Sequence, residues 1–433
     1  MKIIDQESKR QAETLMMIAS ENYASQAVEE SMSSPFGNKY AEGYAGRRYY
    51  QGNAYADEIE RLCVERAMKI FDVPYVNVQP HSGSPANFAV QVALLNPGDT
   101  YMGLSLASGG HLTHGARFTA GSKFFHSVQY GVNAEGFLEY DEIEKLAVEA
   151  KPKLIIAGTT AYPRTIDWRK FSAIAKKVGA FLMADIAHLA GLVAAGVYPS
   201  PVPFVDIVTT TTHKTLRGPR GAMIMITKKG LKKDADLPKK INSAIIPGIQ
   251  GGPHLNSISG IAVALKEAQS VKFQKYAAQI VINAKVLAEA LTNEGFKLVT
   301  GGTDSHLLVA NMAQYDILGN TMAEGCEAAG IVLNRNGVPH DPNPPFYPSG
   351  VRFGTPGLTT RNMKEKEMRL IASWLVVLAR DLQHTAKKLK MSIEDQKRPE
   401  NRAAIIRRSA HTKTIKLKTE ALCKKFPIPQ VYT

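Results

Sequence analysis

Four groups of polar residues have types and spacings that can carry chemistry. The first holds Ser82, Gly83 and Ser84, where an apolar run meets a helical pattern that begins near Pro85. Small hydroxyls, a glycine and free N–H groups at a helix N-terminus can bind a phosphate. The same residues also suit a plain helix cap, so this group alone does not decide between the two interpretations.

The second group is Asp185 and His188, which follow a short apolar run. A carboxylate at the end of a buried strand is costly to desolvate unless a cation or a strong donor faces it. A protonated ring nitrogen of a cofactor would meet this need. A metal ion bound by these two residues with His111 and His114 is the alternative, but the spacing matches none of the usual ligand patterns, so we expect no metal.

The third group places Lys214 after four threonines and beside a loop bracketed by Gly218 and Gly221. A lysine at a strand end can form a Schiff base when its pKa is lowered, although on its own a loop lysine in a salt bridge is the simpler interpretation. A phosphate site, an aspartate for a pyridinium nitrogen and a lysine for an aldehyde are what pyridoxal phosphate (PLP) requires. The first three groups together therefore favour PLP as cofactor.

The fourth group frames Arg352 between Gly350 and Gly354, beside Phe353. A planar guanidinium can bind a carboxylate through two hydrogen bonds, and the amino-acid substrates of PLP enzymes carry a carboxylate. The alternative is an ordinary surface arginine in an ion pair. We take Arg352 as the candidate residue for binding a substrate carboxylate.

These groups need a scaffold, and the pattern between residues 57 and 260 alternates amphipathic helices with short apolar runs. The runs lie at residues 76–78, 153–157, 180–184, 207–211 and 221–226. Such alternation predicts an α/β fold with a mainly parallel sheet and helices on both faces. Open parallel sheets bind ligands at the carboxyl ends of their strands, which is where the first three groups lie.

Beyond the sheet, one long helix over residues 257–290 is expected to lead into a smaller α/β region with strands near residues 297–299 and 306–310. We therefore expect three parts in the chain. They are a helical arm and aromatic loop at residues 1–56, a large PLP-binding domain at residues 57–260, and a linking helix with a small C-terminal domain and basic helical tail at residues 261–433.

The net charge of the chain is +14, from 53 Lys and Arg against 39 Asp and Glu. Residues 382–433 hold 13 of the basic and 4 of the acidic residues, so the tail carries most of the excess. A basic excess is compatible with nucleic acid or an anionic surface as partner. Residues 383–425 contain no Phe, Tyr or Trp to stack on bases, which argues against nucleic acid and for a solvated helical face.

Cysteine usage and hydropathy indicate the compartment. Three widely spaced cysteines with no C-x-x-C pair indicate neither a disulfide framework nor a zinc site, and they fit a reducing environment. The first residues show no signal-peptide pattern, and the apolar stretch at residues 180–199 is interrupted by Asp185 and His188. We therefore expect a cytoplasmic protein with no membrane partner.

Nine short motifs occur in order over nearly the whole chain. They lie at residues 19–22, 38–44, 48–50, 79–84, 109–115, 185–188, 209–214, 247–253 and 352–356. In these motifs the chain resembles the serine hydroxymethyltransferases. The resemblance implies the PLP-dependent transferase fold type I, in which a large domain with a mainly parallel seven-stranded sheet flanked by helices precedes a smaller C-terminal α/β domain. It also implies a homodimer with shared active sites, with a tetramer as the alternative.

The resemblance implies roles for individual residues around PLP. Lys214 would hold the cofactor as an internal aldimine, and Asp185 would face the pyridine nitrogen. His111 would stack on the ring, and His188 would lie near the phenolic oxygen. The remaining expected cofactor contacts are Tyr40, Ser82, Gly83, Ser84, Thr160, Thr211 and Gly252, with Tyr40 and Gly252 supplied by the partner chain.

For the substrate, the resemblance implies that Arg352 binds the carboxylate, assisted by Ser20 and Tyr50. Glu42 is the candidate for proton transfer at the hydroxymethyl end, since a carboxyl screened by Tyr40 and Tyr44 can have the raised pKa that such a group needs. The loop composition alone equally allows a solvated carboxylate at Glu42. The expected catalytic residues are Lys214, Glu42, Tyr50 and His213.

The reaction implied by the resemblance is the reversible conversion of L-serine and tetrahydrofolate to glycine and 5,10-methylenetetrahydrofolate. The expected folate contacts are Leu106, Gly110, Leu112, Asn336, Pro344, Pro345 and Phe346. The alternative is a related PLP aldolase that cleaves threonine-like 3-hydroxy amino acids without folate. Both enzymes would share every cofactor residue, so Glu42 and the folate contacts favour the transferase.

Overall fold

The computed structural model describes residues 1–429 of the 433-residue chain. The N-terminal arm is helical, as expected. Its elements are α1 (Lys2–Glu13), β1 (Leu15–Met16) and α2 (Gln26–Met32), followed by the short hairpin of β2 (Gly43–Tyr44) and β3 (Arg47–Arg48). The expected aromatic loop is therefore folded around a two-residue β-ladder.

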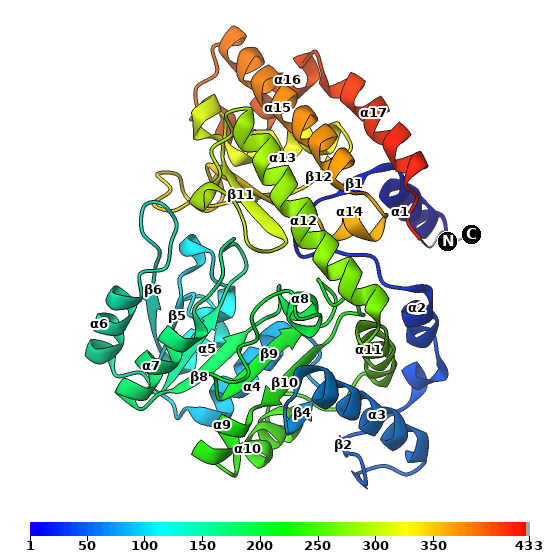
Figure 1. Cartoon of the computed structure of the whole chain (residues 1–433), viewed down its shortest axis with the longest axis vertical. Coiled ribbons are helices and arrows are strands. Elements are labelled where there is room, and N and C mark those ends of the chain that lie inside the picture. The colour runs from blue at the N-terminus through cyan, green and yellow to red at the C-terminus, as the bar shows by residue number, and fades with distance from the viewer. Residues whose placement is uncertain (430–433) are drawn as a thin grey trace.

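A seven-stranded sheet forms the centre of the larger region, which confirms the expected fold class. In spatial order its strands are β4 (Tyr75–Asn77), β10 (Ala222–Ile226), β9 (Ile207–Thr211), β8 (Phe181–Asp185), β7 (Leu154–Gly158), β5 (Thr100–Leu104) and β6 (His126–Tyr130). β10 is antiparallel to both neighbours, and the pairs from β9 to β6 are parallel. Figure 1 shows this sheet with helices on both sides.

Alternate residues of the strands enter different cores, because successive side chains point to opposite faces. In β7, Ile155 and Ala157 pack in one core, whereas Leu154 and Ile156 pack in the other. Both faces are covered, so the central strands read as continuous apolar runs. The helices of this region are α3 (Ala54–Phe71), α4 (Gly83–Leu94), α5 (Ala120–Phe124), α6 (Tyr140–Ala150), α7 (Trp168–Val178), α8 (Ala190–Ala194), α9 (Lys228–Lys233), α10 (Leu237–Ser243) and α11 (Leu255–Ala268).

A second region with its own core follows α12 (Val271–Asn293). Its antiparallel sheet has the order β11 (Leu307–Asn311), β14 (Gly350–Gly354) and β13 (Asn334–Asn336). β12 (Ile331–Val332) pairs in parallel with β1, which ties the N-terminal arm to this region. The other helices are α13 (Gly319–Ala328), α14 (Pro356–Thr360), α15 (Glu365–Lys388), α16 (Pro399–Arg408) and α17 (Thr412–Lys425).

One buried arginine joins the two ends of the described chain. Arg361 is 1% exposed and donates hydrogen bonds to the carbonyl oxygens of Ala12 and Thr14 near the N-terminus. It also donates to the carbonyl oxygens of Cys423 and Phe426 near the C-terminus. Figure 1 accordingly shows α1 beside the end of α17.

The structure corrects two expected elements. The single helix predicted over residues 257–290 is divided into α11 and α12, because Ser270 begins a new helix by accepting a hydrogen bond from the backbone N–H of Phe273 at 3.1 Å. The strand predicted near residues 297–299 is limited to a bridge between Leu298 and Ala310. The expected domain limits at residues 56 and 260 stay a prediction.

Cys63, Cys326 and Cys423 are buried, free thiols. Within residues 1–429, every helix is too short or too polar to cross a bilayer.

Candidate active site

A pocket of about 250 Å³ opens at the carboxyl ends of the parallel strands, where β14 of the second region approaches the large sheet. We call it the Lys214 pocket. Its lining includes these residues expected from the sequence: Ser20, Gly83, Leu106, Gly110, His111, Leu112, Thr160, Asp185, His188, Thr211, Lys214 and Arg352. The structure therefore brings together groups that lie more than 300 positions apart in the chain. The lining also includes Asn87, Thr159 and Ala187, which the sequence did not single out.

Asp185 lies at the last position of β8 and is held by three donors. Asn87 Nδ2 donates to its Oδ2 at 2.7 Å, His114 Nε2 lies 3.0 Å from the same oxygen, and the backbone N–H of Ala187 donates to Oδ1 at 3.0 Å. Burial raises the pKa of this carboxyl, but the contact with His114 and the bond from Asn87 outweigh burial and hold the pKa below its usual value. Asp185 is therefore ionised and can face a positive ring nitrogen.

The sequence interpretation considered His114 only as a possible metal ligand. In the structure His114 is fully buried, and its Nδ1 accepts a hydrogen bond from the backbone N–H of His111 at 3.1 Å. A neutral His114 must then carry its proton on Nε2, which faces Asp185. In the part of the chain that the structure describes, no group of three or more His, Cys, Asp or Glu side chains is arranged to hold a metal ion.

Lys214 extends from the loop after β9 into the pocket. Its Nζ donates to the hydroxyl oxygen of Thr211 at 2.7 Å, and Asn22 Nδ2 donates to its backbone carbonyl at 2.9 Å. Burial lowers the pKa of Lys214 to about 8, and the positive charges of Arg352 and Arg220 add to this effect, while Asp185 opposes it. At neutral pH the fraction of Lys214 in the free-amine form is therefore much larger than that of an exposed lysine.

The start of α4 can hold a phosphate. Ser82 occupies the N-cap position in an extended conformation, and its hydroxyl makes no capping hydrogen bond within the described chain. A Cβ added to Gly83 would lie 2.7 Å from Cγ2 of Thr211, so this position requires glycine. The Ser82 hydroxyl and the first N–H groups of α4 can together accept an anion, and Gly83 lines the same pocket as Lys214. Gly83 lines the pocket, and Ser82 and Ser84 flank it along the chain.

Arg352, on β14, reaches the pocket from the second region. Its Nη1 donates to the carbonyl oxygen of Thr160 at 2.7 Å, and its Nε donates to Oδ1 of Asn334 at 3.1 Å. These bonds orient the guanidinium and use two of its five N–H donors. Burial lowers the pKa of Arg352 to about 10, which leaves it charged at neutral pH. An anchored, buried cation of this shape can bind a carboxylate.

The two pocket histidines are neutral. Burial lowers the pKa of His111 to about 4 and that of His188 well below its usual range. His111 Nδ1 lies 2.8 Å from the hydroxyl of Thr113, which fixes the ring at the edge of the pocket. Thr160 also lines the pocket, but its hydroxyl is committed to the carbonyl oxygen of Gly110 at 3.0 Å.

Four other expected residues, Tyr40, Glu42, Tyr50 and Gly252, lie outside the pocket. With Gly251, which was not among the expected residues, they form a second group that we call the Glu42 cluster. The hydroxyl of Tyr40 donates to Glu42 at 3.2 Å, and the rings of Tyr40 and Tyr50 meet edge to face at 5.0 Å. A Cβ on Gly251 would lie 2.8 Å from Glu42 Oε1, and one on Gly252 would lie 3.3 Å from the ring of Tyr40. The cluster is thus one packed unit.

The buried side chain of Arg48 fixes the backbone of the Glu42 cluster. Arg48 donates to the carbonyl oxygens of Ala41 and Gly43, each at 2.9 Å, and its ion pairs with Asp57 and Glu60 are also 2.9 Å long. The loop backbone on both sides of Glu42 is therefore fixed. Tyr44, which was expected to screen Glu42, instead donates to the carbonyl oxygen of Asn242 at 2.8 Å.

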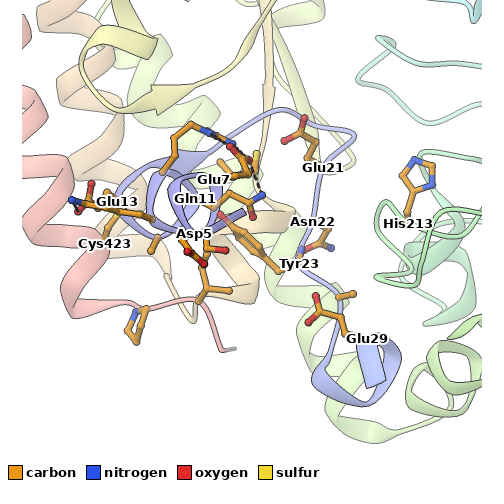
Figure 2. Close-up of a pocket in the computed structure, with 18 of the residues that line it drawn as sticks. Asp5, Glu7, Gln11, Glu13, Glu21, Asn22, Tyr23, Glu29, His213 and Cys423 are labelled. Atoms are coloured by element: carbon orange, nitrogen blue, oxygen red, sulfur yellow. Dashed lines mark hydrogen bonds and ion pairs between the residues drawn. The ribbon is translucent and has the colours of Figure 1, made fainter. Parts of the chain in front are cut away.

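A larger cavity, of about 850 Å³, adjoins the Lys214 pocket and shares Ser20 with it. Figure 2 shows the cavity between α1, the segment of Glu21 to Tyr23, the chain near Cys423 and the loop that carries His213. His213, expected to be catalytic, lines this cavity, and burial lowers its pKa to about 3.

The expected folate residues are divided. Leu106 and Leu112 are each 40% exposed at the pocket. Asn336 lines a separate small cavity, and Phe346 is 74% exposed. Pro344 and Pro345 are also exposed. The geometry thus groups Leu106, Gly110 and Leu112 with Lys214, and the roles of all these folate residues stay predictions.

A seven-stranded α/β sheet that brings a buried lysine, an ionised aspartate and a helix start suited to a phosphate to one pocket is typical of a PLP-dependent transferase of fold type I. Comparison with known proteins agrees. The family model for serine hydroxymethyltransferase matches residues 1–375. The chain belongs to the serine hydroxymethyltransferase family.

Individual relatives match over most of their length. Serine hydroxymethyltransferase 2 of Pseudomonas fluorescens is 48% identical over 425 residues, covering 98% of this chain and 95% of that protein. Serine hydroxymethyltransferase of Legionella pneumophila is 52% identical over 375 residues, covering 86% and 89%. Serine hydroxymethyltransferase 1 of Pseudomonas aeruginosa is 50% identical over 373 residues, covering 86% and 88%. The chain is thus a PLP enzyme of serine, glycine and tetrahydrofolate, and these matches do not favour the aldolase alternative.

Proposed function

We propose that the chain interconverts serine and glycine at the Lys214 pocket, with the residue roles expected from the sequence. The observation that carries this proposal is the convergence of three charged groups on one pocket. Lys214 supplies a buried amine, Asp185 an ionised carboxylate and Arg352 an anchored guanidinium. An amino acid joined to PLP needs these three contacts, at the aldehyde, the ring nitrogen and the substrate carboxylate.

PLP, when bound, supplies an electron-accepting ring that stabilises negative charge at the α-carbon of the substrate. Asp185 keeps a proton on the pyridine nitrogen because it stays ionised. Lys214, with its lowered pKa, takes and returns a proton near neutral pH. Arg352 binds the carboxylate and orients the substrate, and the buried walls of the pocket exclude water from the reacting carbon.

We further propose a homodimer in which the Glu42 cluster of each chain completes the Lys214 pocket of its partner. The cluster is fixed from inside by Arg48, while Tyr40 and Tyr50 are 54% and 47% exposed. Glu42 would then transfer the proton at the hydroxymethyl group of serine, Tyr50 would contact the substrate, and Tyr40 and Gly252 would contact the phosphate. Leu106, Gly110 and Leu112 would contact folate at the mouth of the pocket, with Asn336 and the turn at residues 344–346.

The test uses the visible colour and the folate dependence of the purified protein. Covalently bound PLP should give a yellow protein whose absorption changes on addition of glycine and tetrahydrofolate, and Lys214→Ala should lose this absorption. Serine cleavage should require added tetrahydrofolate. A colourless wild-type protein after incubation with PLP would contradict the PLP site. A rate of serine cleavage that does not change when tetrahydrofolate is added would favour the aldolase.

The free cysteines support the expectation of a reducing, cytoplasmic location.

A further inference from the structure

The side chain of Asn22 joins three parts of the fold. Its Nδ2 donates to the backbone carbonyl oxygen of Lys214 at 2.9 Å, in the loop after β9. Its Oδ1 accepts a hydrogen bond from the hydroxyl of Thr360 at 2.7 Å, at the end of α14. Asn22 itself lies between β1 and α2 and lines the larger cavity, where Figure 2 shows it on the segment that faces the loop of His213. The N-terminal arm, the Lys214 loop and the second region therefore meet at one amide.

The partners of Asn22 determine which end of its amide faces Lys214. The backbone N–H of Tyr23 donates to Oδ1 of Asn22 at 2.9 Å, and a carbonyl oxygen such as that of Lys214 can only accept. The second N–H of Nδ2 donates to the hydroxyl oxygen of Tyr276 on α12 at 2.7 Å. A flipped amide would lose the bonds to both backbone groups. This position therefore requires a side chain with both a donor and an acceptor.

The loop that carries Lys214 is also held from within the large region. The Lys214 carbonyl accepts a second hydrogen bond, from the backbone N–H of Arg217 at 3.0 Å. The hydroxyl of Thr215 donates to the carbonyl oxygen of His188 at 2.9 Å and accepts from the backbone N–H of Gly191 at 3.0 Å. These contacts tie the loop to the segment after β8. The Asn22 contact adds a link from the loop to the second region.

That link ends close to Arg352 in the chain. Arg352 lies on β14, and α14, which ends at Thr360, directly follows this strand. Thr360 is 5% exposed, and every residue of α14 is buried, so the segment is firmly packed. An amino-acid substrate joined to PLP takes the place of the Lys214 amine while its carboxylate contacts Arg352. The placement of the amine relative to the guanidinium must therefore match the substrate.

We propose that Asn22, oriented by Thr360, is a positioning residue that holds the backbone of Lys214 in place relative to the segment that carries Arg352. This inference rests on the proposed function, in which Lys214 and Arg352 act on one substrate. The guanidinium of Arg352 has hydrogen bonds of its own, which do not involve Asn22. Loss of the Asn22 contact therefore misplaces the Lys214 amine but leaves the carboxylate site intact. The steps that use the amine slow, while substrate binding is retained.

The first test is the rate at which PLP-free protein takes up PLP, followed by absorption with no substrate present. Asn22→Asp keeps the shape of the side chain but sets an oxygen against the Lys214 carbonyl, so we expect the uptake rate to fall about tenfold. Asn22→Ala should slow uptake by a similar factor without adding a charge. Slow uptake in Asn22→Asp alone would be an effect of the charge and would overturn the inference.

The second test is steady-state serine cleavage, normalised to the number of PLP-bound sites. In both Asn22 variants we expect kcat to fall about 10–100-fold, with KM for serine within about threefold of wild type. A purely structural role would reduce the amount of PLP-bound enzyme and leave kcat per site unchanged, which would overturn the inference. A rise in KM at unchanged kcat would also overturn it, because the effect would then lie at the carboxylate contact.

Two substitutions of Thr360 provide an independent test if the Asn22 variants fail to fold. Thr360→Val removes the hydroxyl that orients Asn22 and should slow PLP uptake about threefold. Thr360→Ser retains a hydroxyl and should recover most of the wild-type rate. An unchanged rate in Thr360→Val, or equal losses in the two variants, would contradict the proposed role.

Asn283→Asp is the matched control. Asn283 is fully buried on α12, and its Nδ2 donates to the carbonyl oxygen of Met363 and to the hydroxyl of Thr359, each at 2.9 Å. The control thus loses the same kind of hydrogen bonds beside α14, but Asn283 does not line the Lys214 pocket. Its uptake rate per folded protein should equal that of wild type, and an equal slowing would overturn the inference. A wild-type protein that binds no PLP covalently would instead contradict the proposed function.

Discussion

The Lys214 pocket and the Glu42 cluster differ in how completely one chain builds them. In the pocket, Asp185 and Lys214 are buried and each is held by hydrogen bonds from its own chain. In the cluster, Arg48 fixes the backbone, but the rings of Tyr40 and Tyr50 remain about half exposed. The charged groups proposed to bind the cofactor thus come from one chain, whereas Glu42, the acid–base group expected for the hydroxymethyl end, is partly buried beside two exposed tyrosine rings. This difference is what a site shared between two chains would require.

The largest effect should come from mixing two inactive variants. Lys214→Ala and Glu42→Gln should each reduce kcat by about 10³-fold or more, since each removes an acid–base group. Chains mixed after unfolding and refolding should recover about a quarter of wild-type activity, because half of the dimers are hybrids with one intact site. Folate-dependent serine cleavage measures the recovery.

A mixture of two differently tagged Glu42→Gln chains is the control and should stay inactive. Hybrids that form without any recovery would show that pocket and cluster serve the same chain.

Substitution of the carboxylate-binding residue should raise KM rather than alter the bound cofactor. Arg352→Lys keeps the charge but loses the planar fork, so we expect KM for serine to rise about 10–100-fold with the PLP absorption unchanged. Steady-state kinetics and the visible spectrum check both parts. Arg335→Lys, on the neighbouring strand and exposed, is the matched control. Equal changes in the two variants would contradict the role of Arg352.

The rate at which the PLP-free protein takes up PLP should depend on pH through Lys214. Its pKa is lowered to about 8, so below that pH the amine is mostly protonated and cannot attack an aldehyde. The uptake rate should rise about tenfold per pH unit up to about pH 8 and then level off. Arg335→Lys should show the same profile, since Arg335 is exposed and belongs to neither the pocket nor the cluster. A rate that keeps rising toward pH 10 would show that burial does not lower the pKa of Lys214.

The smallest effect concerns the free energy of unfolding. Asn87→Ala removes a donor from Asp185 and the acceptor of the Thr209 hydroxyl, so it should lower this free energy by about 2–3 kcal/mol. Tyr50→Phe changes an exposed hydroxyl and should stay within about 0.5 kcal/mol of wild type. Urea denaturation measures both. Equal losses of unfolding free energy in the two variants would mean that the cluster contributes as much to the stability of its own chain as the pocket does.

The strand-end residues of the pocket were predictable because each belongs to a local motif. Asp185 directly follows the run at residues 180–184, Lys214 lies three positions after the run at residues 207–211, and parallel strands bring their carboxyl ends to one edge. Partners that reach across the fold were not predictable. Asn87 bonds Asp185 from 98 positions away, and His306 meets His188 across 118 positions. No local spacing encodes such contacts, since they depend on how packed elements meet.

The edge strand β6 and the break between α11 and α12 were not predicted, because neither has a clear local pattern. β6 is an edge strand with mixed polar and apolar residues, so it lacks the apolar run that identified its neighbours. The break between α11 and α12 continues a helical pattern on both sides, and only Ser270 marks it. Glu42 was identified from the family motif, but its separation from Lys214 depends on where the loop before α3 packs.

The Arg361 contacts set an order for folding during synthesis. This side chain bonds carbonyl groups near residues 12–14 and near residues 423–426, so its hydrogen bonds are complete only when almost the whole chain is present. At roughly 5–20 residues per second, the arm waits roughly 20–80 s for its C-terminal partner to leave the ribosome. During that time the segment of residues 12–14 lacks the contacts through Arg361 that tie it to residues 423–426.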